Sequence, residues 1–247
     1  MIARRRPGDG PVRRVCDVFG AAGLLLVLSP LLALTASAVL VVLGRPVSFR
    51  QQRCGRGGGE FTILKFRTLR AAERPDQPDA ERTTRLGAVL RATGTDELPQ
   101  LVNVLRGEMS FIGPRPALPE HVGNYDRRQT GRLAVRPGIT GWAQVRGRNA
   151  LSWPERIELD LDYIRRRGLL LDLRILMLTA VVVLVPRGVV GPGGVNRGMP
   201  APGEDSGPRD PHRAGRHRAD LRDGWTPAAP GGADIARHRR DDEPAVR

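Results

Sequence analysis

The stretch TDELPQL, residues Thr95–Leu101, places two adjacent acids directly before the start of a predicted helix. Pro99 marks that start, because proline is tolerated in a first helical turn, where its missing N–H would have no partner. Apolar residues then recur at helical spacing until Gly107. Asp96 and Glu97 are therefore expected beside the positive end of the helix dipole, which stabilises a charged carboxylate by about 0.3–1 kcal/mol.

An ionised acid at this position has two interpretations. It can act as a nucleophile or a metal ligand, or it can cap the helix, which is a common role for an acid near a helix start. The stretch alone favours capping. The rest of the sequence therefore has to decide whether Asp96 and Glu97 carry chemistry.

Composition points to a basic protein with enough apolar residues for a core. The chain has 247 residues, 40% of them hydrophobic, and a net charge of +14, which lies in the first 197 residues because residues 198–247 hold nine Arg and nine Asp or Glu. A basic surface suits the phosphates of a nucleic acid, an anionic lipid or a phosphorylated substrate. All 40 basic residues except Lys65 are Arg. Lys65 either marks a site that needs a compact ammonium or occurs by chance.

The two cysteines lie in unlike contexts, Cys16 at the edge of an apolar run and Cys54 in a loop rich in Gly and Arg. They lack metal-type spacing, and the four histidines form no cluster in the sequence, which argues against a zinc site. We expect two free thiols in a reducing compartment.

Residues 18–44 carry no charge and follow a basic N-terminus, residues 1–17, which predicts a membrane segment. Arg-rich flanks on both sides favour the cytoplasmic side of the bilayer for both ends. Near the middle, Pro30 interrupts a helix and the Ser29 hydroxyl can bond a freed carbonyl. A re-entrant hairpin and a kinked spanning helix both fit, whereas the run continues too far past Ala38 for a cleaved signal peptide.

A β-hairpin is predicted after the membrane segment. Residues 47–49 and 61–68 form two strand-like runs around the Gly-rich turn 55–59. In the second strand, Lys65 and Arg67 project from the same face. Two cations so placed can hold a diphosphate, although a solvated strand face is the alternative.

Arg115 lies between two prolines in the run GPRP, residues Gly113–Pro116. Its backbone therefore loses freedom before any ligand binds. A preorganised guanidinium suits bidentate recognition of phosphate, and a rigid structural turn is the alternative.

The remaining segments are mostly helical in pattern. Helices are expected over residues 86–92 and 117–130, and a capping box at Ser152 opens another that ends before Gly168. The apolar stretch 169–185 is interrupted by two charges and is predicted to be an interfacial or core helix. Residues 198–247 are predicted to be a disordered tail.

Five motifs in order resemble the bacterial sugar transferase family, the polyprenyl-phosphate hexose-1-phosphate transferases or monotopic phosphoglycosyl transferases. The resemblance covers roughly residues 14–188. The motifs are Ser29-Pro30, Lys65–Thr68 (KFRT), Leu90-Arg91 leading into Asp96–Gln100 (DELPQ), Gly113–Pro116 (GPRP), and Pro137–Val145 (PGITGWAQV) followed by Gly147–Asn149 (GRN).

The resemblance implies an α+β fold, with a mainly helical cytosolic domain and a small β-hairpin anchored by an N-terminal re-entrant membrane helix. Residues 18–44 would form the anchor, kinked at Ser29 and Pro30, and residues 45–190 the catalytic domain. The expected location is the bacterial inner membrane, with the catalytic domain on its cytoplasmic face and lipid as a partner.

The resemblance also implies a reaction. A UDP-sugar gives its sugar-1-phosphate to polyprenyl phosphate, such as undecaprenyl phosphate, with Mg²⁺ as cofactor, at the first membrane step of a bacterial polysaccharide or glycoconjugate pathway. Asp96 matches the nucleophile that forms an aspartyl-phosphosugar intermediate, and Glu97 is the candidate metal ligand or aid to the nucleophile. The candidate phosphate-binding residues are Lys65, Arg67, Arg91, Arg115 and Arg148.

The step before the acidic pair departs from the family pattern, with Gly94-Thr95 in place of the usual Ser-Leu. This loss of a Leu is expected to loosen the catalytic loop. It therefore leaves open the alternative that the protein is a catalytically lapsed membrane scaffold or nucleotide-sugar-binding protein. Nucleic-acid binding would use the Arg excess, but no reader motif supports it, so no nucleic acid is expected as a partner. The sequence indicates neither the sugar nor the oligomeric state.

Overall fold

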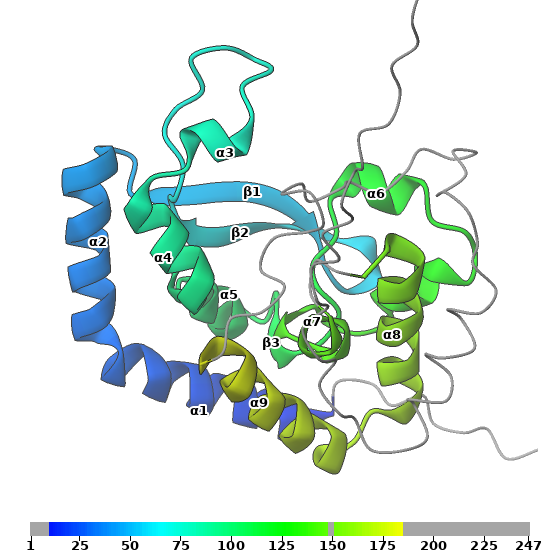
Figure 1. The fold of residues 1–247 in the computed structure, drawn as a ribbon. Helices are drawn as coiled ribbons and strands as arrows, with labels where there is room; N and C mark the ends of the chain where they lie inside the picture. The colour runs from blue at the N-terminus through cyan, green and yellow to red at the C-terminus, as the bar shows by residue number, and fades with distance from the viewer. Residues whose placement is uncertain (1–9, 148–150, 185–247) are drawn as a thin grey trace, which may run out of the picture. The chain divides into compact units, whose positions relative to one another are not determined.

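The computed structural model describes residues 10–147 and 151–184, so the predicted tail 198–247 and most of the basic N-terminus lie outside the described residues. The fold is mainly helical with a small antiparallel hairpin, as predicted (Figure 1). The elements, in chain order, are α1 (Pro11–Val27), α2 (Ser29–Leu43), β1 (Ser48–Cys54), η1 (Arg56–Gly58), β2 (Glu60–Phe66), α3 (Asp79–Arg82), α4 (Arg85–Thr93), η2 (Thr95–Glu97), α5 (Gln100–Arg106), β3 (Ser110–Ile112), α6 (Pro119–Gly123), η3 (Gln129–Ala134), β4 (Gly138–Thr140), α7 (Trp142–Arg146), α8 (Trp153–Arg166) and α9 (Leu169–Leu184).

Helices α1 and α2 meet at Leu28 and are bent by 63° (Figure 1). Ser29 Oγ donates a hydrogen bond to the Leu26 carbonyl at 2.7 Å, and Pro30 lies in the first turn of α2, where a missing N–H costs nothing. The predicted interruption at Ser29-Pro30 is therefore confirmed. In the described part of the chain no single helix has the length and apolar composition to cross a bilayer, although the bent pair together does.

One side of α2 packs against β2 and α4, and the other side is exposed. Val39 is fully buried against Phe66 of β2 and Leu90 of α4. On the exposed side, Leu34 and Val41 have exposed fractions of 68% and 85%. Such exposure of large apolar side chains is typical of an interaction surface.

The predicted hairpin is confirmed, and β1 runs further than expected, to Cys54. β1 and β2 pair antiparallel along their whole length, from Ser48 opposite Phe66 to Cys54 opposite Glu60. Both cysteines are free thiols, as predicted, and the structure shows that Cys16 is exposed whereas Cys54 is buried.

A second, two-stranded sheet was not predicted, because β3 and β4 have only three residues each and carry no strand-length pattern. They pair parallel, with Ser110 opposite Gly138 and Ile112 opposite Thr140. A Cβ atom on Gly138 would collide with the backbone nitrogen of Gly113, and one on Gly113 with the Arg136 carbonyl. Glycine at these two positions therefore permits the close approach that fixes the loop carrying Arg115.

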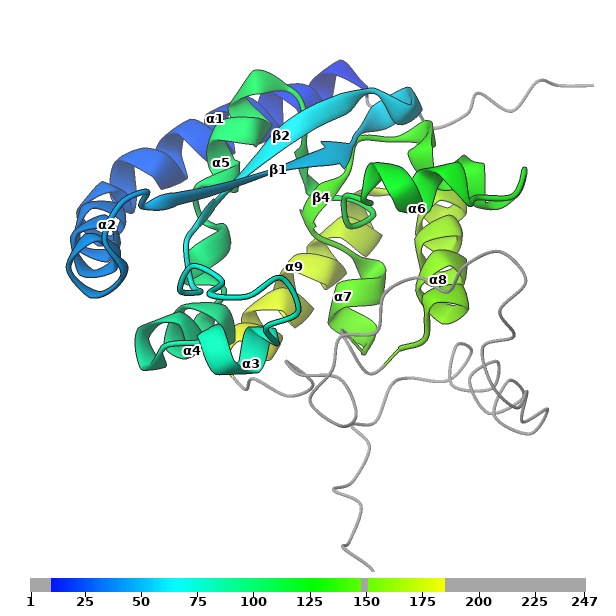
Figure 2. The same cartoon turned by 90° about the horizontal axis from the view of Figure 1, so that it is seen from above.

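Helix α5 occupies the centre of the fold, between the hairpin and α1 (Figures 1 and 2). It begins after Pro99 and ends at Gly107, which has a left-handed φ of 82°, so the predicted helix is confirmed. The buried Asn103 side chain accepts from the Leu64 N–H at 3.1 Å and donates to the Thr62 carbonyl at 2.8 Å. These bonds fix the position of α5 relative to β2.

The first turn of α1 is bound to the C-terminal helices through polar contacts. Arg13 forms an ion pair with Asp172 of α9 and donates to the hydroxyl of Tyr163, which is fully buried in α8. One residue later, Arg14 donates to the carbonyls of Val104 and Leu105 at the end of α5. The first turn of α1 is thus fixed to α5, α8 and α9.

The predicted helix over residues 117–130 is wrong. The chain instead forms the short helix α6, a turn, and η3. The Asp126 carboxylate accepts hydrogen bonds at 2.7 Å from the backbone N–H groups of Arg128 and Gln129, a local turn that competes with helix. The capping box at Ser152 is confirmed, with Glu155 as its acidic member.

Candidate active site

The acidic pair lies in a short turn between two helices. Gly94 ends α4 in the left-handed conformation, with φ 72° and ψ 7°, which glycine adopts without strain. Thr95 to Glu97 then form one 3₁₀ turn, and Pro99 leads into α5. The Gly94-Thr95 step therefore suits the local backbone, and it delivers Asp96 into a buried position with 8% of its surface exposed.

Glu97 joins two cations that are far apart in the sequence. Its Oε1 atom lies 2.6 Å from Lys65 Nζ and 3.0 Å from Arg115 Nη2. The side chains of Lys65 and Glu97 are mostly buried, with exposed fractions of 15% and 19%, whereas that of Arg115 is half exposed. Strand β2, the turn η2 and the loop after β3 thus bring these three charges together beside Asp96.

The two neighbouring carboxylates have opposite pKa shifts. Burial and then the negative charge of Glu97 raise the pKa of Asp96 to about 6. Burial also acts to raise the pKa of Glu97, but the charges of Arg115 and Lys65 outweigh it and lower this pKa to about 2. Environments that separate two carboxylates in this way are typical of sites where the two have different roles.

Asp96 has the properties of a nucleophile in this arrangement. At pH 7, one unit above its pKa, about nine in ten Asp96 side chains are ionised. The carboxylate is nevertheless poorly solvated, and the structure gives its side chain no hydrogen bond or ion pair with another described residue. Glu97 instead stays ionised at any physiological pH and holds the two cations in place.

Arg67, one of the predicted phosphate-binding residues, contacts the end of α2 in this structure. Arg67 donates to the carbonyls of Leu43, Gly44 and Arg45 and so caps the end of α2. Among the described residues, no hydrogen bond or ion pair links Arg67 to Asp96 or Glu97, so a basic wall of Lys65 and Arg67 stays a prediction.

Arg91 donates to Thr83 Oγ1, and among the described residues no hydrogen bond or ion pair links it to Asp96 or Glu97. Arg148 lies outside the described residues. The roles predicted for both therefore stay predictions.

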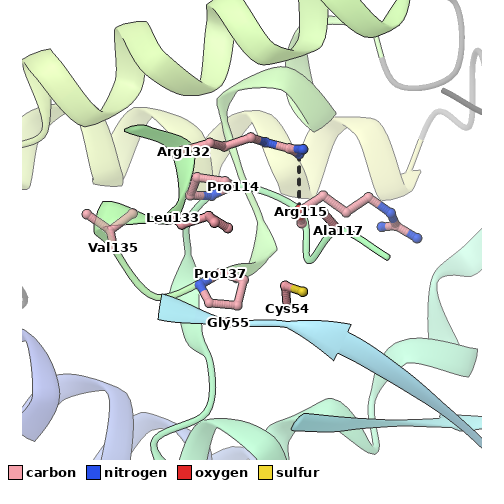
Figure 3. A pocket seen from close by; sticks show the side chains of 9 residues that line it. All are labelled: Cys54, Gly55, Pro114, Arg115, Ala117, Arg132, Leu133, Val135 and Pro137. Atoms are coloured by element: carbon pink, nitrogen blue, oxygen red, sulfur yellow. Dashed lines mark hydrogen bonds between the residues drawn. The ribbon is translucent and has the colours of Figure 1, made fainter. Parts of the chain in front are cut away.

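A buried ion pair that the sequence analysis missed supports Arg115 from behind. Arg132 Nε lies 2.6 Å from Asp160 Oδ2, and the two residues have exposed fractions of 4% and 1%. Arg132 also donates to the backbone carbonyl of Arg115 at 3.0 Å (Figure 3). Asp160 lies on the buried face of α8 with Ile157 and Leu161, and an acid on an apolar helix face is the one sequence signal that could have found it.

Figure 3 shows a small pocket between Arg132 and β1. Cys54, Pro114 and Pro137 line it, and the side chain of Arg115 extends away from it. The pocket therefore backs the loop that carries Arg115 and does not hold the acidic pair.

The acidic pair fits a metal ion only in part. In residues 10–147 and 151–184, no three His, Cys, Asp or Glu side chains are grouped to hold a metal. Mg²⁺ is commonly held by one or two carboxylates together with substrate phosphates. Asp96 and Glu97 meet that lesser requirement, because both cations contact Oε1 of Glu97 and leave Oε2 available.

Comparison with known proteins gives consistent matches. A sequence model described as "Bacterial sugar transferase" matches residues 9–186. The "Uncharacterized sugar transferase EpsL" of Bacillus subtilis is 43% identical over 182 residues, which cover 72% of this chain and 90% of the relative. The UDP-glucose:undecaprenyl-phosphate glucose-1-phosphate transferase of Caulobacter vibrioides is 44% identical over 202 residues, covering 72% and 74%.

A further relative, the "Exopolysaccharide production protein ExoY" of Rhizobium meliloti, is 38% identical over 205 residues. This alignment covers 74% of this chain and 90% of the relative. Each of these three alignments therefore extends over most of both proteins.

Proposed function

Because the chain belongs to the bacterial sugar transferase family, we propose that it transfers a sugar-1-phosphate from a UDP-sugar to undecaprenyl phosphate. The observation that carries the proposal is Asp96, a buried carboxylate with a raised pKa beside the Lys65–Glu97–Arg115 cluster. The names of several relatives, which specify UDP-glucose and undecaprenyl phosphate, support the same donor and acceptor.

The proposed reaction has two displacements at one phosphorus. An Asp96 oxygen attacks the phosphorus that bears the sugar, the bridging P–O bond breaks, and its electron pair leaves on UMP. An oxygen of undecaprenyl phosphate then attacks the same phosphorus and releases the Asp96 carboxylate. Splitting the transfer in this way keeps the two anionic substrates from having to approach each other directly.

Lys65 and Arg115 neutralise phosphate oxygens during both displacements. In the structure they share Glu97 Oε1, so each is already held near Asp96 before a substrate arrives. Preorganised cations stabilise the charge of the transition state without reorganising at the moment of reaction. Mg²⁺, held by Asp96 or Glu97 together with the phosphates, would supply further neutralisation.

We further propose that α1 and α2 form a re-entrant anchor in the bacterial inner membrane, with the catalytic domain on the cytoplasmic face. The support is the 63° bend and the apolar residues exposed on both helices. A lipid substrate explains why the site needs such an anchor. The exposed apolar residues of the two helices are Val12, Val15, Phe19, Leu24, Leu26, Val27, Leu31, Leu34, Leu40, Val41 and Val42.

The test is release of UMP by the full-length protein in detergent with undecaprenyl phosphate and a panel of UDP-sugars. We expect release with at least one donor, together with a lipid-linked sugar diphosphate. Labelled UMP should also exchange into the UDP-sugar without the lipid, because the first displacement does not need it. Binding of a UDP-sugar with no release of UMP for any donor would support the scaffold hypothesis instead.

The pKa of Asp96 predicts the pH dependence of the reaction. Only the carboxylate attacks, so kcat/KM should fall below about pH 6, where Asp96 becomes protonated. Glu97→Gln removes the negative charge that helps to raise the Asp96 pKa, so the acidic limb should move to lower pH. UMP release by the wild type and by Glu97→Gln, measured from pH 5 to 9, checks this prediction. If the acidic limb lies at the same pH in both proteins, the charge of Glu97 does not raise the pKa of Asp96.

A further inference from the structure

Arg53 faces the same side of the hairpin as Lys65. In the β1–β2 ladder, Arg53 is opposite Phe61 and Phe49 is opposite Lys65. Directly opposite residues of an antiparallel pair project from the same face, and so do residues two apart in one strand. Gln51, Arg53 and Lys65 therefore share the face that meets the acidic pair.

The Arg53 side chain is held in place by neutral groups. It donates to Gln51 Oε1 at 2.6 Å and to the Pro116 carbonyl at 3.3 Å, while its buried Nε has no hydrogen-bond partner among the residues that the structure describes. Within the described residues it forms no ion pair with a carboxylate. Pro116 follows Arg115 directly, so Arg53 reaches the loop that carries the second cation of the site.

Charge around Arg53 is unbalanced. Burial, and next the positive charge of Arg115, lower the pKa of Arg53 to about 10, and Glu120 and Glu97 offset this only in part. Arg53 is thus a partly buried cation that these carboxylates compensate only in part, and an anion bound there would complete the compensation.

We propose that Arg53 binds the phosphate that leaves with the nucleotide, while Lys65 and Arg115 hold the phosphate attacked by Asp96. This inference rests on the proposed function. When the bridging P–O bond breaks, its electron pair passes to the UMP phosphate, which gains one negative charge. A guanidinium held by Gln51 and the Pro116 carbonyl is preorganised to form charge-assisted hydrogen bonds with that phosphate.

The experiment measures UMP binding to the full-length protein in detergent, by calorimetry and as product inhibition against UDP-glucose. Arg53→Gln should weaken UMP binding by about tenfold or more, which is the usual effect of losing a charge-assisted hydrogen bond. Arg53→Lys should give an intermediate affinity, because the ammonium keeps the charge but not the planar fork. Arg50→Gln is the matched control: Arg50 is exposed on the same strand, and its loss should leave UMP affinity unchanged.

The outcomes separate this inference from the proposed function. If a folded Arg53→Gln or Arg53→Lys protein binds UMP as tightly as the wild type, the assignment of Arg53 is overturned. UMP release by the wild type would then still support the proposed reaction. If Arg50→Gln weakens UMP binding as much as Arg53→Gln does, the assignment is also overturned, because the loss of any positive charge on the strand would then have the same effect. If the wild type releases no UMP from any donor, the proposed function fails, whatever Arg53 binds. Arg53→Lys decides the case if Arg53→Gln does not fold.

Discussion

Asp96→Asn is expected to lower the rate of UMP release by about four orders of magnitude or more, because an amide of the same shape cannot act as the nucleophile. Donor affinity should change little, since Lys65, Glu97 and Arg115 remain. Wild-type protein quenched during turnover should carry a labelled sugar phosphate, and Asp96→Asn should carry none. A variant that keeps a tenth of the wild-type rate would rule out Asp96 as the nucleophile.

Stability provides a check that is independent of activity. Because folding raises the pKa of Asp96 from 3.8 to about 6, the fold disfavours the ionised form by on the order of 3 kcal/mol above pH 6. This cost disappears as the pH falls below 3.8. A neutral Asn avoids it, so Asp96→Asn should melt no lower than wild type at pH 8.

Glu97→Gln is the matched comparison for that stability measurement. Folding lowers the pKa of the wild-type Glu97 side chain, so the ionised carboxylate stabilises the protein above about pH 4.5. This stabilisation is lost as the pH falls toward 2. Removing the charge leaves Lys65 and Arg115 without their shared carboxylate. The melting temperature at pH 8 should therefore fall, opposite to the result for Asp96→Asn.

Asp160→Asn is expected to lower the free energy of unfolding by about 3–5 kcal/mol, because it leaves Arg132 as a buried cation without a carboxylate partner. It should also slow UMP release, since Arg132 holds the backbone of Arg115. Thermal melting with and without UDP-glucose measures the loss of stability. The rate of UMP release at increasing UDP-glucose concentration measures the effect on activity.

Glu158→Gln on the same helix is the control for Asp160→Asn. Glu158 pairs with Arg128 at 2.6 Å, but both side chains are about half exposed, and such pairs contribute about 0–1 kcal/mol. Replacing Arg132 and Asp160 together by Met and Leu should recover part of the lost stability, because no buried charge then remains. Equal melting temperatures for Asp160→Asn and Glu158→Gln would show that the Arg132–Asp160 pair does not hold the loop that carries Arg115.

Several features of the fold followed from local sequence. Ser29-Pro30 predicted the helix interruption, Pro99 and Gly107 the limits of α5, and Ser152 with Glu155 the capping box of α8. Each of these depends on backbone hydrogen bonds and dihedral angles within about four residues. The failure over residues 117–130 has the same origin, because the side chain of Asp126 offers the backbone a turn that periodicity does not reveal.

The sequence by itself determined the main elements of the chain and, through its ordered motifs, the family. Only the tertiary structure decided which charges meet: it placed Lys65 and Arg115 on Glu97, sent Arg67 to the end of α2, and put Arg132 behind the active-site loop. The separate pKa values of Asp96 and Glu97 also depend on it. The reason is physical, because solvation and Coulomb energy depend on distances through space, and these are set by how β2, η2 and the loop after β3 pack.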